Sequence, residues 1–221
     1  MPGITVTIDG PAGAGKSTVA RLLAQRLGYV YVDTGAMYRA LTLAVMRAGE
    51  DPADGERIAA LLARTAIVLS EAGVRLDGED VSAEVRTPAV DRLVSRVSAH
   101  PPVREAMLRR QRALAREGGA VIEGRDAGTA IAPDARCKFF LTASLDERAR
   151  RRAAELRARG VAALAETLRE DMARRDREDS ERAVAPLAVP DDAEVVDTTG
   201  LGIEDIVRRL AARCAAAVPT P

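Results

Sequence analysis

The residues best suited to chemistry form a glycine-rich run that ends in a lysine and a serine. Residues 10–17 read Gly-Pro-Ala-Gly-Ala-Gly-Lys-Ser, which fits the pattern G-x-x-x-x-G-K-[ST]. An alternating apolar segment precedes the run and a helical pattern follows it, which is the strand-to-helix setting that the pattern requires. Glycines let successive backbone N–H groups turn toward an anion, and the helix adds the positive end of its dipole. The run predicts a phosphate-binding loop.

Two side chains of this loop have predicted roles beyond the backbone. Lys16 is placed to neutralise the β- and γ-phosphates of ATP, and the Ser17 hydroxyl to hold a Mg²⁺ that bridges them. The predicted ATP-binding residues are Gly10, Pro11, Ala12, Gly13, Ala14, Gly15, Lys16, Ser17 and Thr18. The alternative is an ordinary glycine-rich turn. Because GTPases, motors and kinases share the pattern, it names no reaction by itself. A signalling GTPase would also need an Asn-Lys-x-Asp stretch, and its absence favours a kinase.

Two further charged segments could bind a second anion. The run 33–39, Asp-Thr-Gly-Ala-Met-Tyr-Arg, follows a predicted strand and leads into a helix, which places Arg39 near the mouth of a crevice. The alternative there is a helix capped by Thr34 with a solvated Arg39. The run 123–126, Glu-Gly-Arg-Asp, puts Arg125 and Asp126 after another strand, where Gly124 lets the backbone approach a ligand closely.

Arginines also dominate two helical patterns near the end of the chain. Arg148 and Arg152 are spaced i, i+4 and share one face of a helix over residues 146–159, which suits a lid that closes over phosphates. After a break at Gly160, a second charged helix is predicted from residue 162 to about residue 177, and residues 174–182 form a dense stretch of mixed charge. For both helices the alternative is a solvated charged face.

The elements that must position these residues alternate between strand and helix. Predicted strands cover residues 4–9, 29–32, 120–123, 137–141 and 193–197, with helical patterns between them. This order predicts an α/β fold, a P-loop three-layer sandwich with a five-stranded parallel sheet. Its ligand should lie beyond the carboxyl ends of the strands. The polar residues placed there are Asp9, Asp33, Arg125, Thr142 and Asp197.

About 85 residues separate the second and third strands, far more than one crossover helix needs. Helical patterns over 37–47 and 56–64 are followed by three short strand patterns, 67–69, 74–76 and 79–81, with turns at residues 72–73 and 77–78. A helix over 102–116 returns the chain to the third strand. We therefore expect a core of residues 1–37 and 103–221 with a lid at about 146–162, and an inserted movable arm of residues 38–102 with a small antiparallel sheet.

Composition excludes several function classes. The 33 basic and 33 acidic residues balance, so no global field attracts nucleic acid or an anionic membrane, and the chain has no Trp for base stacking. No run approaches the ~18 apolar residues of a spanning helix. Cys137 and Cys214 have no metal-site spacing and are read as buried, reduced thiols. We expect a cytoplasmic protein that binds neither nucleic acid nor membrane, and a monomer.

Taken in order, five segments resemble the bacterial cytidylate kinase family of P-loop nucleoside monophosphate kinases. They are the loop at 8–17, the run 33–39, Val-Arg-Glu-Ala-Met-Leu-Arg-Arg-Gln at 103–111, Gly-Arg-Asp-Ala-Gly-Thr at 124–129 and Arg-Ala-Val-Ala-Pro-Leu at 182–187. The match covers nearly the whole chain. It implies an enzyme that transfers the γ-phosphoryl group of ATP to CMP, and to dCMP, with Mg²⁺. The alternatives are a kinase for another monophosphate or small metabolite, or a nucleotide-binding switch without catalysis.

The resemblance also implies roles for individual residues. Arg39, Arg125 and Arg182 would grip the phosphate of the acceptor, whereas Ser95, Arg104 and Asp126 would read the cytosine edge. Arg175 and Asp179 resemble the pair that contacts the ribose, and Thr34 is a variant of a small residue in the family motif. The residues expected to supply positive charge during transfer are Lys16, Arg39, Arg125, Arg148, Arg152 and Arg182. No general base is needed, because the accepting phosphate oxygen is already ionised. The arm of residues 38–102 would bind the monophosphate, and closure of arm and lid would exclude water. Either Asp33 or Glu123 could order the waters of Mg²⁺.

Overall fold

A five-stranded parallel sheet forms the centre of the computed structural model, which describes residues 3–70, 73–116, 118–158, 160–161 and 164–217. The strand order is β2-β6-β1-β7-β8 and every pairing is parallel. The strands are β1 (Val6–Asp9), β2 (Val30–Asp33), β6 (Ala120–Glu123), β7 (Cys137–Thr142) and β8 (Glu194–Asp197). All five predicted strands are confirmed, with bounds that differ by at most two residues. β1 and β6 are buried along their whole length, as a parallel sheet covered on both faces requires.

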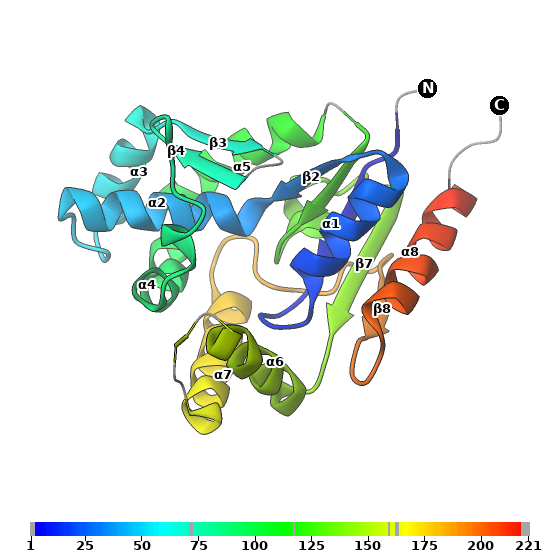
Figure 1. Cartoon of the computed structure of the whole chain (residues 1–221). Helices are drawn as coiled ribbons and strands as arrows, with labels where there is room; N and C mark the ends of the chain where they lie inside the picture. Colours follow the sequence, from blue (N-terminus) through cyan, green and yellow to red (C-terminus); the bar gives the residue numbers. More distant parts are fainter. Residues whose placement is uncertain (1–2, 71–72, 117, 159, 162–163, 218–221) are drawn as a thin grey trace.

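Helices cover both faces of this sheet, which makes the predicted three-layer sandwich (Figure 1). On one face α1 (Lys16–Leu27) and α8 (Ile203–Ala217) pack side by side, and their apolar residues join Val6, Ile8 and Phe139 in one cluster. On the other face α5 (Pro101–Ala115) and a π-helical turn, Ala127–Ile131, pack against Val32 and Ile122. The two faces divide because side chains alternate along each strand, so Val121 and Ile122 join different clusters.

The insert between β2 and β6 has an apolar cluster of its own. It contains α2 (Thr34–Ala48), α3 (Gly55–Arg64) and the antiparallel sheet β3 (Ile67–Ser70), β4 (Gly73–Leu76) and β5 (Glu79–Asp80). The three short strands are confirmed, and so is the turn at 77–78, where Asp77 and Gly78 both have positive φ. Residue 72 of the other expected turn lies outside the described residues. The cluster also takes in Val103 and Met107 of α5, so the insert packs on the core rather than standing alone.

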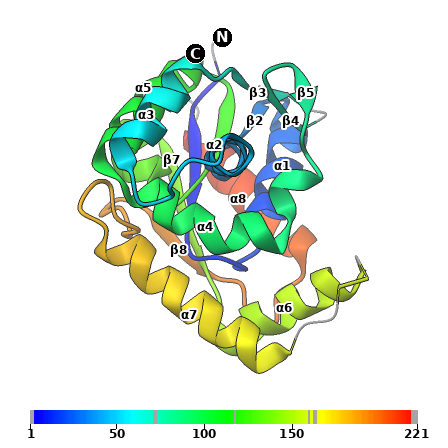
Figure 2. The same ribbon diagram turned by 90° about the vertical axis from the view of Figure 1, so that its left-hand side faces the viewer.

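The sequence analysis missed one helix of the insert, α4 (Pro88–Ala99). Its signals are present: Pro88 occupies the first helical turn, where proline is favoured, and Val90, Val94 and Val97 recur at helical spacing. All three valines are buried, and α4 packs against α2 and α5. Figure 2 shows α4 above α7 (Ala165–Glu181), with which it is in contact, so this helix lies where the insert meets the C-terminal part of the chain.

The basic helix predicted after β7 is α6 (Leu145–Ala158), which packs against α7. The break at Gly160 is confirmed by its positive φ, and α7 ends at Glu181, later than the sequence pattern suggested. Residues 159 and 162, which bound the predicted lid and the second helix, lie outside the described residues. Among the helices that are described, none is long and apolar enough to cross a membrane.

Two isoleucines on α8 provide a matched test of this packing. Ile206 is 4% exposed against the sheet, whereas Ile203 is 46% exposed on the same helix. We expect Ile206→Ala to lower the free energy of unfolding by about 2–4 kcal/mol, and Ile203→Ala by less than about 1 kcal/mol. Urea unfolding followed by circular dichroism measures both values. Equal losses in the two variants would contradict the assigned packing of α8.

Candidate active site

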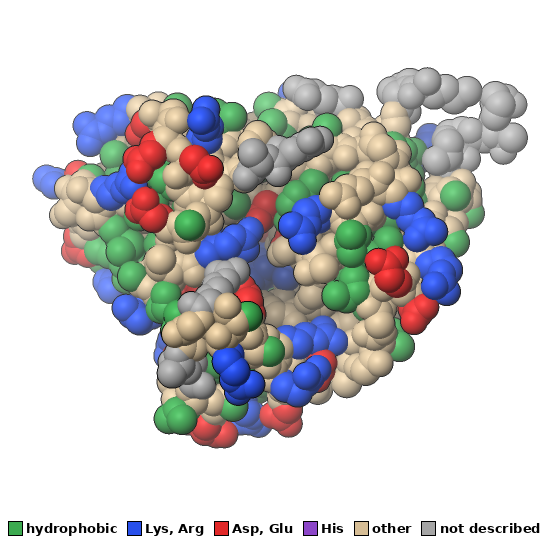
Figure 3. Space-filling view, in the orientation of Figure 1, with side chains coloured by type: hydrophobic (Ala, Val, Ile, Leu, Met, Phe, Trp, Pro, Cys, Tyr) green, Lys and Arg blue, Asp and Glu red, His purple; other side chains and the backbone are tan. Residues whose placement is uncertain are grey.

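A cavity of about 1070 Å³ lies at the carboxyl edge of the sheet, between the glycine-rich loop, the insert and helices α6 and α7. Figure 3 shows it as a hollow with Lys and Arg side chains inside. Its lining includes residues 12–19, Asp33 and Arg125 after their strands, Arg39 and Asp91 from the insert, Arg150, Arg151 and Arg152 from α6, and Arg175 from α7. The cavity therefore lies beyond the strand ends, where the sequence predicted that a ligand would bind.

The glycine-rich loop wraps this cavity because its backbone adopts conformations that other residues avoid. Gly10 has φ 141°, and a Cβ there would lie 1.9 Å from the carbonyl oxygen of Leu141. Gly15 has φ 89° directly before the first turn of α1, whose backbone N–H groups face the loop. Inside the loop, the Lys16 Nζ donates to the Pro11 carbonyl at 2.8 Å. Burial, followed by the charge of Arg125, lowers the pKa of Lys16 to about 7, so the site favours an added anion.

Glu123 at the end of β6 holds two hydroxyl groups. Ser17 Oγ donates to Glu123 Oε1 at 2.6 Å, and Tyr31 Oη donates to Glu123 Oε2 at 2.6 Å. Burial, and then the charge of Asp33, raise the pKa of Glu123 above its usual value. Asp33 itself is engaged elsewhere, since it caps α2 by accepting from Ala36 N and pairs with Arg86. This corrects the alternative in which Thr34 caps α2, because the Thr34 hydroxyl donates to the Glu123 carbonyl at 2.6 Å.

Asp9, the last residue of β1, stabilises the backbone and does not line the cavity. It is fully buried and accepts from Ala127 N and Gly128 N, both at 2.7 Å, which anchors the π-helical turn after Asp126. Burial raises the pKa of Asp9 to about 6 against these two hydrogen bonds. The Thr142 carbonyl accepts from the N–H and the hydroxyl of Thr198, and the Asp197 carboxylate accepts from Thr199 N in the loop after β8. Of the five predicted strand-end residues, only Asp33 and Arg125 line the cavity.

Three arginines from separate elements converge on the cavity. Arg39 comes from α2, Arg125 follows β6, and Arg175 lies on α7. Burial, and then the charges of Arg125 and Arg39, lower the pKa of Arg175 to about 10, and its buried Nε has no hydrogen-bond partner. Asp179 offsets part of this charge by accepting from Arg125 Nε at 3.0 Å. A group of like charges that nearby carboxylates neutralise only in part is suited to binding a multiply charged anion.

The predicted cytosine-reading residues lie behind this group of arginines. Asp126 accepts from Arg104 Nη2 at 2.5 Å and from Arg182 Nη2 at 3.1 Å, and all three side chains are buried. Ser95 lines the cavity, whereas Arg104 and Asp126 do not. Three buried polar atoms in this region have no partner, namely Ser95 Oγ, Arg104 Nε and the hydroxyl of Tyr38, whose ring lies 5.3 Å from the Arg104 guanidinium. These orphaned atoms fit a site that a polar ligand would complete.

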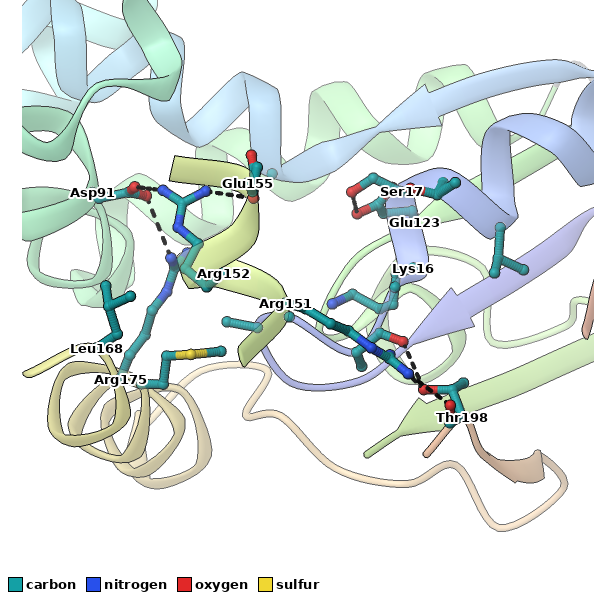
Figure 4. Close-up of a pocket in the computed structure, with 18 of the residues that line it drawn as sticks. Lys16, Ser17, Asp91, Glu123, Arg151, Arg152, Glu155, Leu168, Arg175 and Thr198 are labelled. Atoms are coloured by element: carbon teal, nitrogen blue, oxygen red, sulfur yellow. Dashed lines mark hydrogen bonds and ion pairs between the residues drawn. The ribbon is translucent and has the colours of Figure 1, made fainter. Parts of the chain in front are cut away.

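The arginines of the predicted lid helix, α6, lie in two different environments, behind the glycine-rich loop and in the cavity. Arg148 points toward the loop backbone, where it donates to the carbonyls of Ala12 and Ala143 and pairs with Asp176 at 2.5 Å. It is buried and does not line the cavity, so it braces the loop. Arg152 lies in the cavity and pairs with Asp91 (Figure 4). Arg151, which the sequence analysis missed, donates to the hydroxyl and carbonyl of Thr198. The sequence does not single out Arg151, because arginines occupy all three positions 150–152 and the local pattern does not show which side chain turns toward the cavity.

Taken together, the site offers positive charge and backbone donors instead of a nucleophile. Among the described residues there is no group of three or more His, Cys, Asp or Glu side chains that could hold a metal ion by itself. A Mg²⁺ carried by nucleotide phosphates needs only one or two protein oxygens, however, and Ser17 with Glu123 can supply them. Cys137 and Cys214 lie away from the cavity, free and buried as predicted. The arrangement suits transfer of a phosphoryl group.

Comparison with known proteins agrees with this chemistry. The family described as "Cytidylate kinase" matches residues 6–215. The chain is 50% identical over 216 residues to a cytidylate kinase of Pelotomaculum thermopropionicum, covering 96% of both proteins. It is 51% identical over 211 residues to a cytidylate kinase of Geobacillus kaustophilus, covering 94% of both. A solved structure of an uncharacterized protein from Eubacterium ventriosum resembles it with a TM-score of 0.53 at 13% identity, covering 96% of this chain and 99% of that one, which supports the fold alone.

The bracing position of Arg148 predicts an effect on nucleotide binding. Arg148→Lys removes the planar fork that joins Ala12, Ala143 and Asp176, so we expect ATP binding to weaken about tenfold. Arg157→Lys is the matched control, because Arg157 is exposed on the same helix and does not line the cavity. Calorimetric titration measures both affinities. Unchanged binding together with slower turnover would instead favour the original prediction that Arg148 touches the transferring phosphate.

Proposed function

Since the chain belongs to the cytidylate kinase family, we propose that its cavity binds ATP at the glycine-rich loop and CMP beneath the insert, with the two phosphate groups facing each other among the arginines. The chain is an enzyme, a kinase that transfers the γ-phosphoryl group of ATP to CMP. The residue roles, the metal and the use of dCMP are the proposed part.

The observation that carries the proposal is the convergence of positive charge from four separate elements. Lys16, Arg39, Arg125 and Arg175 line one cavity, and mutual repulsion together with burial lowers the pKa of both Lys16 and Arg175. Such an arrangement is unfavourable without a bound anion and favourable with one. We assign Lys16 to the ATP phosphates and Arg39 and Arg125 to the phosphate of CMP. Arg182 would act behind them, because it is buried against Asp126 and Asp179.

Recognition of the base would rest on Asp126. Its two oxygens accept from Arg104 and Arg182, and a carboxylate can accept about four hydrogen bonds, so it retains capacity for the exocyclic amine of cytosine. Ser95 and Arg104 each have an unpaired polar atom that a base could satisfy. Uracil has a carbonyl where cytosine has the amine, and two facing acceptors would stay unpaired. Arg175 and Asp179 remain assigned to the ribose, and Thr34 supports Glu123.

Catalysis in this proposal consists of positioning and electrostatic stabilisation. The accepting phosphate oxygen is already ionised, so no side chain has to remove a proton. Lys16 and the arginines orient the two phosphates in line and offset the charge that spreads over the transferred group. Arg152 of the lid and Arg39 of the arm would reach this group from opposite walls. Closure of both walls excludes water and so limits hydrolysis of ATP.

The proposed metal site consists of Ser17 supported by Glu123. The Ser17 hydroxyl lies 2.6 Å from Glu123 Oε1, whereas Asp33 is occupied by its cap and by Arg86. When bound, Mg²⁺ would offset charge on the β- and γ-phosphates. We further propose that the core and arm divide at residues 37–38 and 102–103, and that the enzyme is a cytoplasmic monomer. It would also accept dCMP, since no predicted contact involves the ribose 2′-hydroxyl alone.

Acceptor specificity tests the proposal directly. ADP release is measured with ATP, Mg²⁺ and each of CMP, dCMP, UMP, AMP and dTMP. We expect turnover with CMP and dCMP, and a value of kcat/KM for UMP about 10- to 100-fold lower, because a buried acceptor without a partner costs about 1–3 kcal/mol. In Asp126→Asn the ratio of CMP to UMP activity should fall toward one. Release of ADP that does not depend on any acceptor would favour the non-catalytic switch.

The control for this experiment addresses folding. Removing the charge of Asp126 leaves Arg104 and Arg182 without their shared partner, so the variant should lose stability. The ratio of CMP to UMP activity is measured within one preparation, so it does not depend on the folded fraction. Asp134→Asn, an exposed position in the loop before β7, should leave the ratio unchanged. An unchanged ratio in Asp126→Asn would show that another residue reads the base.

Metal dependence gives a second test. EDTA should abolish turnover and added Mg²⁺ should restore it. We expect Ser17→Ala and Glu123→Gln to raise the Mg²⁺ concentration for half-maximal activity about tenfold or more at constant ATP, because each removes an oxygen near the phosphates. Asp33→Asn should change this concentration little. The reverse pattern, with Asp33→Asn affecting the metal and Glu123→Gln not, would assign the carboxylate role to Asp33.

A further inference from the structure

Asp91 lies where the insert, the lid helix and α7 meet, and the sequence analysis gave it no role. It is on α4, and its carboxylate contacts three arginines from three other elements. Asp91 Oδ1 lies 2.6 Å from Arg39 Nη1 and 3.7 Å from Arg175 Nη1, while Oδ2 accepts from Arg152 Nη2. Figure 4 shows the guanidinium groups of Arg152 and Arg175 next to each other and both directed at Asp91. One carboxylate therefore brings together side chains of α2, α6 and α7.

Charge balance explains why these arginines need a common partner. Arg39 and Arg175 oppose each other's charge, and burial adds to the effect on Arg175. Burial works to raise the pKa of Asp91, but Arg39, Arg152 and Arg175 together hold it below its usual value. The carboxylate is thus charged and offsets part of the repulsion among the three guanidinium groups. Without it, side-chain rotation that separates the arginines would relieve the repulsion.

These contacts leave some N–H donors of the three arginines available for phosphate. A guanidinium carries five N–H donors on three nitrogens, and Asp91 contacts one nitrogen of each arginine. Arg39 uses the same Nη1 toward the Val85 carbonyl, and Arg152 uses its other Nη toward Glu155. Arg175 keeps a buried Nε without a hydrogen-bond partner. Asp91 therefore orients the groups without taking up all of the donors that an anion needs.

The ion pair between Asp91 and Arg152 joins the two walls of the cavity. α4 belongs to the insert that would cover CMP, and Arg152 belongs to the helix that would cover ATP. An ion pair between them can form only when the two walls approach each other. Its side chains are about one fifth exposed, so water screens the pair only in part. The pair therefore favours the conformation in which both nucleotides are enclosed.

From these contacts we propose that Asp91 is a positioning residue that couples closure of the insert over CMP to closure of the lid over ATP, by holding Arg39, Arg152 and Arg175 at the site of phosphoryl transfer. The proposal rests on the function proposed above. It assigns to Asp91 no contact with either nucleotide. Binding of one nucleotide stabilises the closed pair of walls, and the second nucleotide then binds to a site that is already assembled.

The experiment compares CMP binding with and without a bound ATP analogue that cannot transfer its phosphate. In calorimetric titrations of the whole enzyme with Mg²⁺, the analogue should tighten CMP binding about 5- to 100-fold. In Asp91→Asn, which keeps the shape and removes the charge, this factor should fall to about one or two. Steady-state KM values for CMP and ATP should both rise several-fold, with a smaller change in kcat. Asp91→Glu should restore part of the coupling.

Asp146→Asn is the matched control, because Asp146 pairs with Arg169 across α6 and α7 on the exposed surface. It should leave the coupling factor unchanged. Combining Asp91→Asn with Arg152→Gln should weaken coupling no further than the more severe single variant, because both remove the same contact. Normal coupling in Asp91→Asn, an equal loss in Asp146→Asn, or no coupling in the unaltered enzyme would overturn the proposal. Failure of the proposed function would differ, since the unaltered enzyme would then release no CMP-dependent ADP.

Discussion

Repulsion among cationic side chains at one cavity is the constraint on which the rest of the site depends. Lys16, Arg39, Arg125 and Arg175 come from four elements and face the same space, and burial makes their charges costly. In the proposed function this cost is offset when phosphates bind, because the same charges would stabilise groups that bring several negative charges. The surrounding structure must therefore keep them together before any nucleotide binds.

Carboxylates behind and between the cations meet that requirement. Asp179 contacts Arg125 and Arg182, Asp126 contacts Arg104 and Arg182, and Asp91 contacts the arginines that lie on both walls. Each takes only part of the donors of its partners. This division lets a carboxylate orient an arginine and leaves other N–H groups of that arginine available for a ligand. The backbone supports the same arrangement, since Asp9 fixes the turn after Asp126 and Arg148 fixes the glycine-rich loop.

The fold provides two walls of different construction. The insert has its own apolar cluster and joins the core through α2 and α5, so it can be positioned as one body with Ser95, Arg39 and Asp91 on its inner side. The opposite wall is a pair of charged helices, α6 and α7, with few buried apolar residues. Contacts there are mostly ion pairs, which depend on solvent and ligand more than apolar packing does. Such a wall is suited to opening and closing during a catalytic cycle.

The sequence by itself determined the sheet, the glycine-rich loop and the arginines that could bind phosphate. Their signals are local: apolar strands followed by turns, a fixed spacing of glycines, and charged residues at strand ends. Helix α4 was not predicted, although Pro88 and the spacing of the valines indicate it. The mixed strand and helix patterns of the insert did not define where this helix begins and ends.

Only the tertiary structure decided which of these charged residues act together. Arg148 and Arg152 share a helix face by spacing, yet one braces Ala12 and the other reaches Asp91, because different elements pack beside each turn of α6. Glu123 and Asp33 were equivalent candidates in sequence, and the partners Ser17 and Arg86 distinguish them. The physical reason is that charge interactions depend on distances of a few ångströms between segments far apart in the chain, and those distances follow from packing rather than from any local pattern.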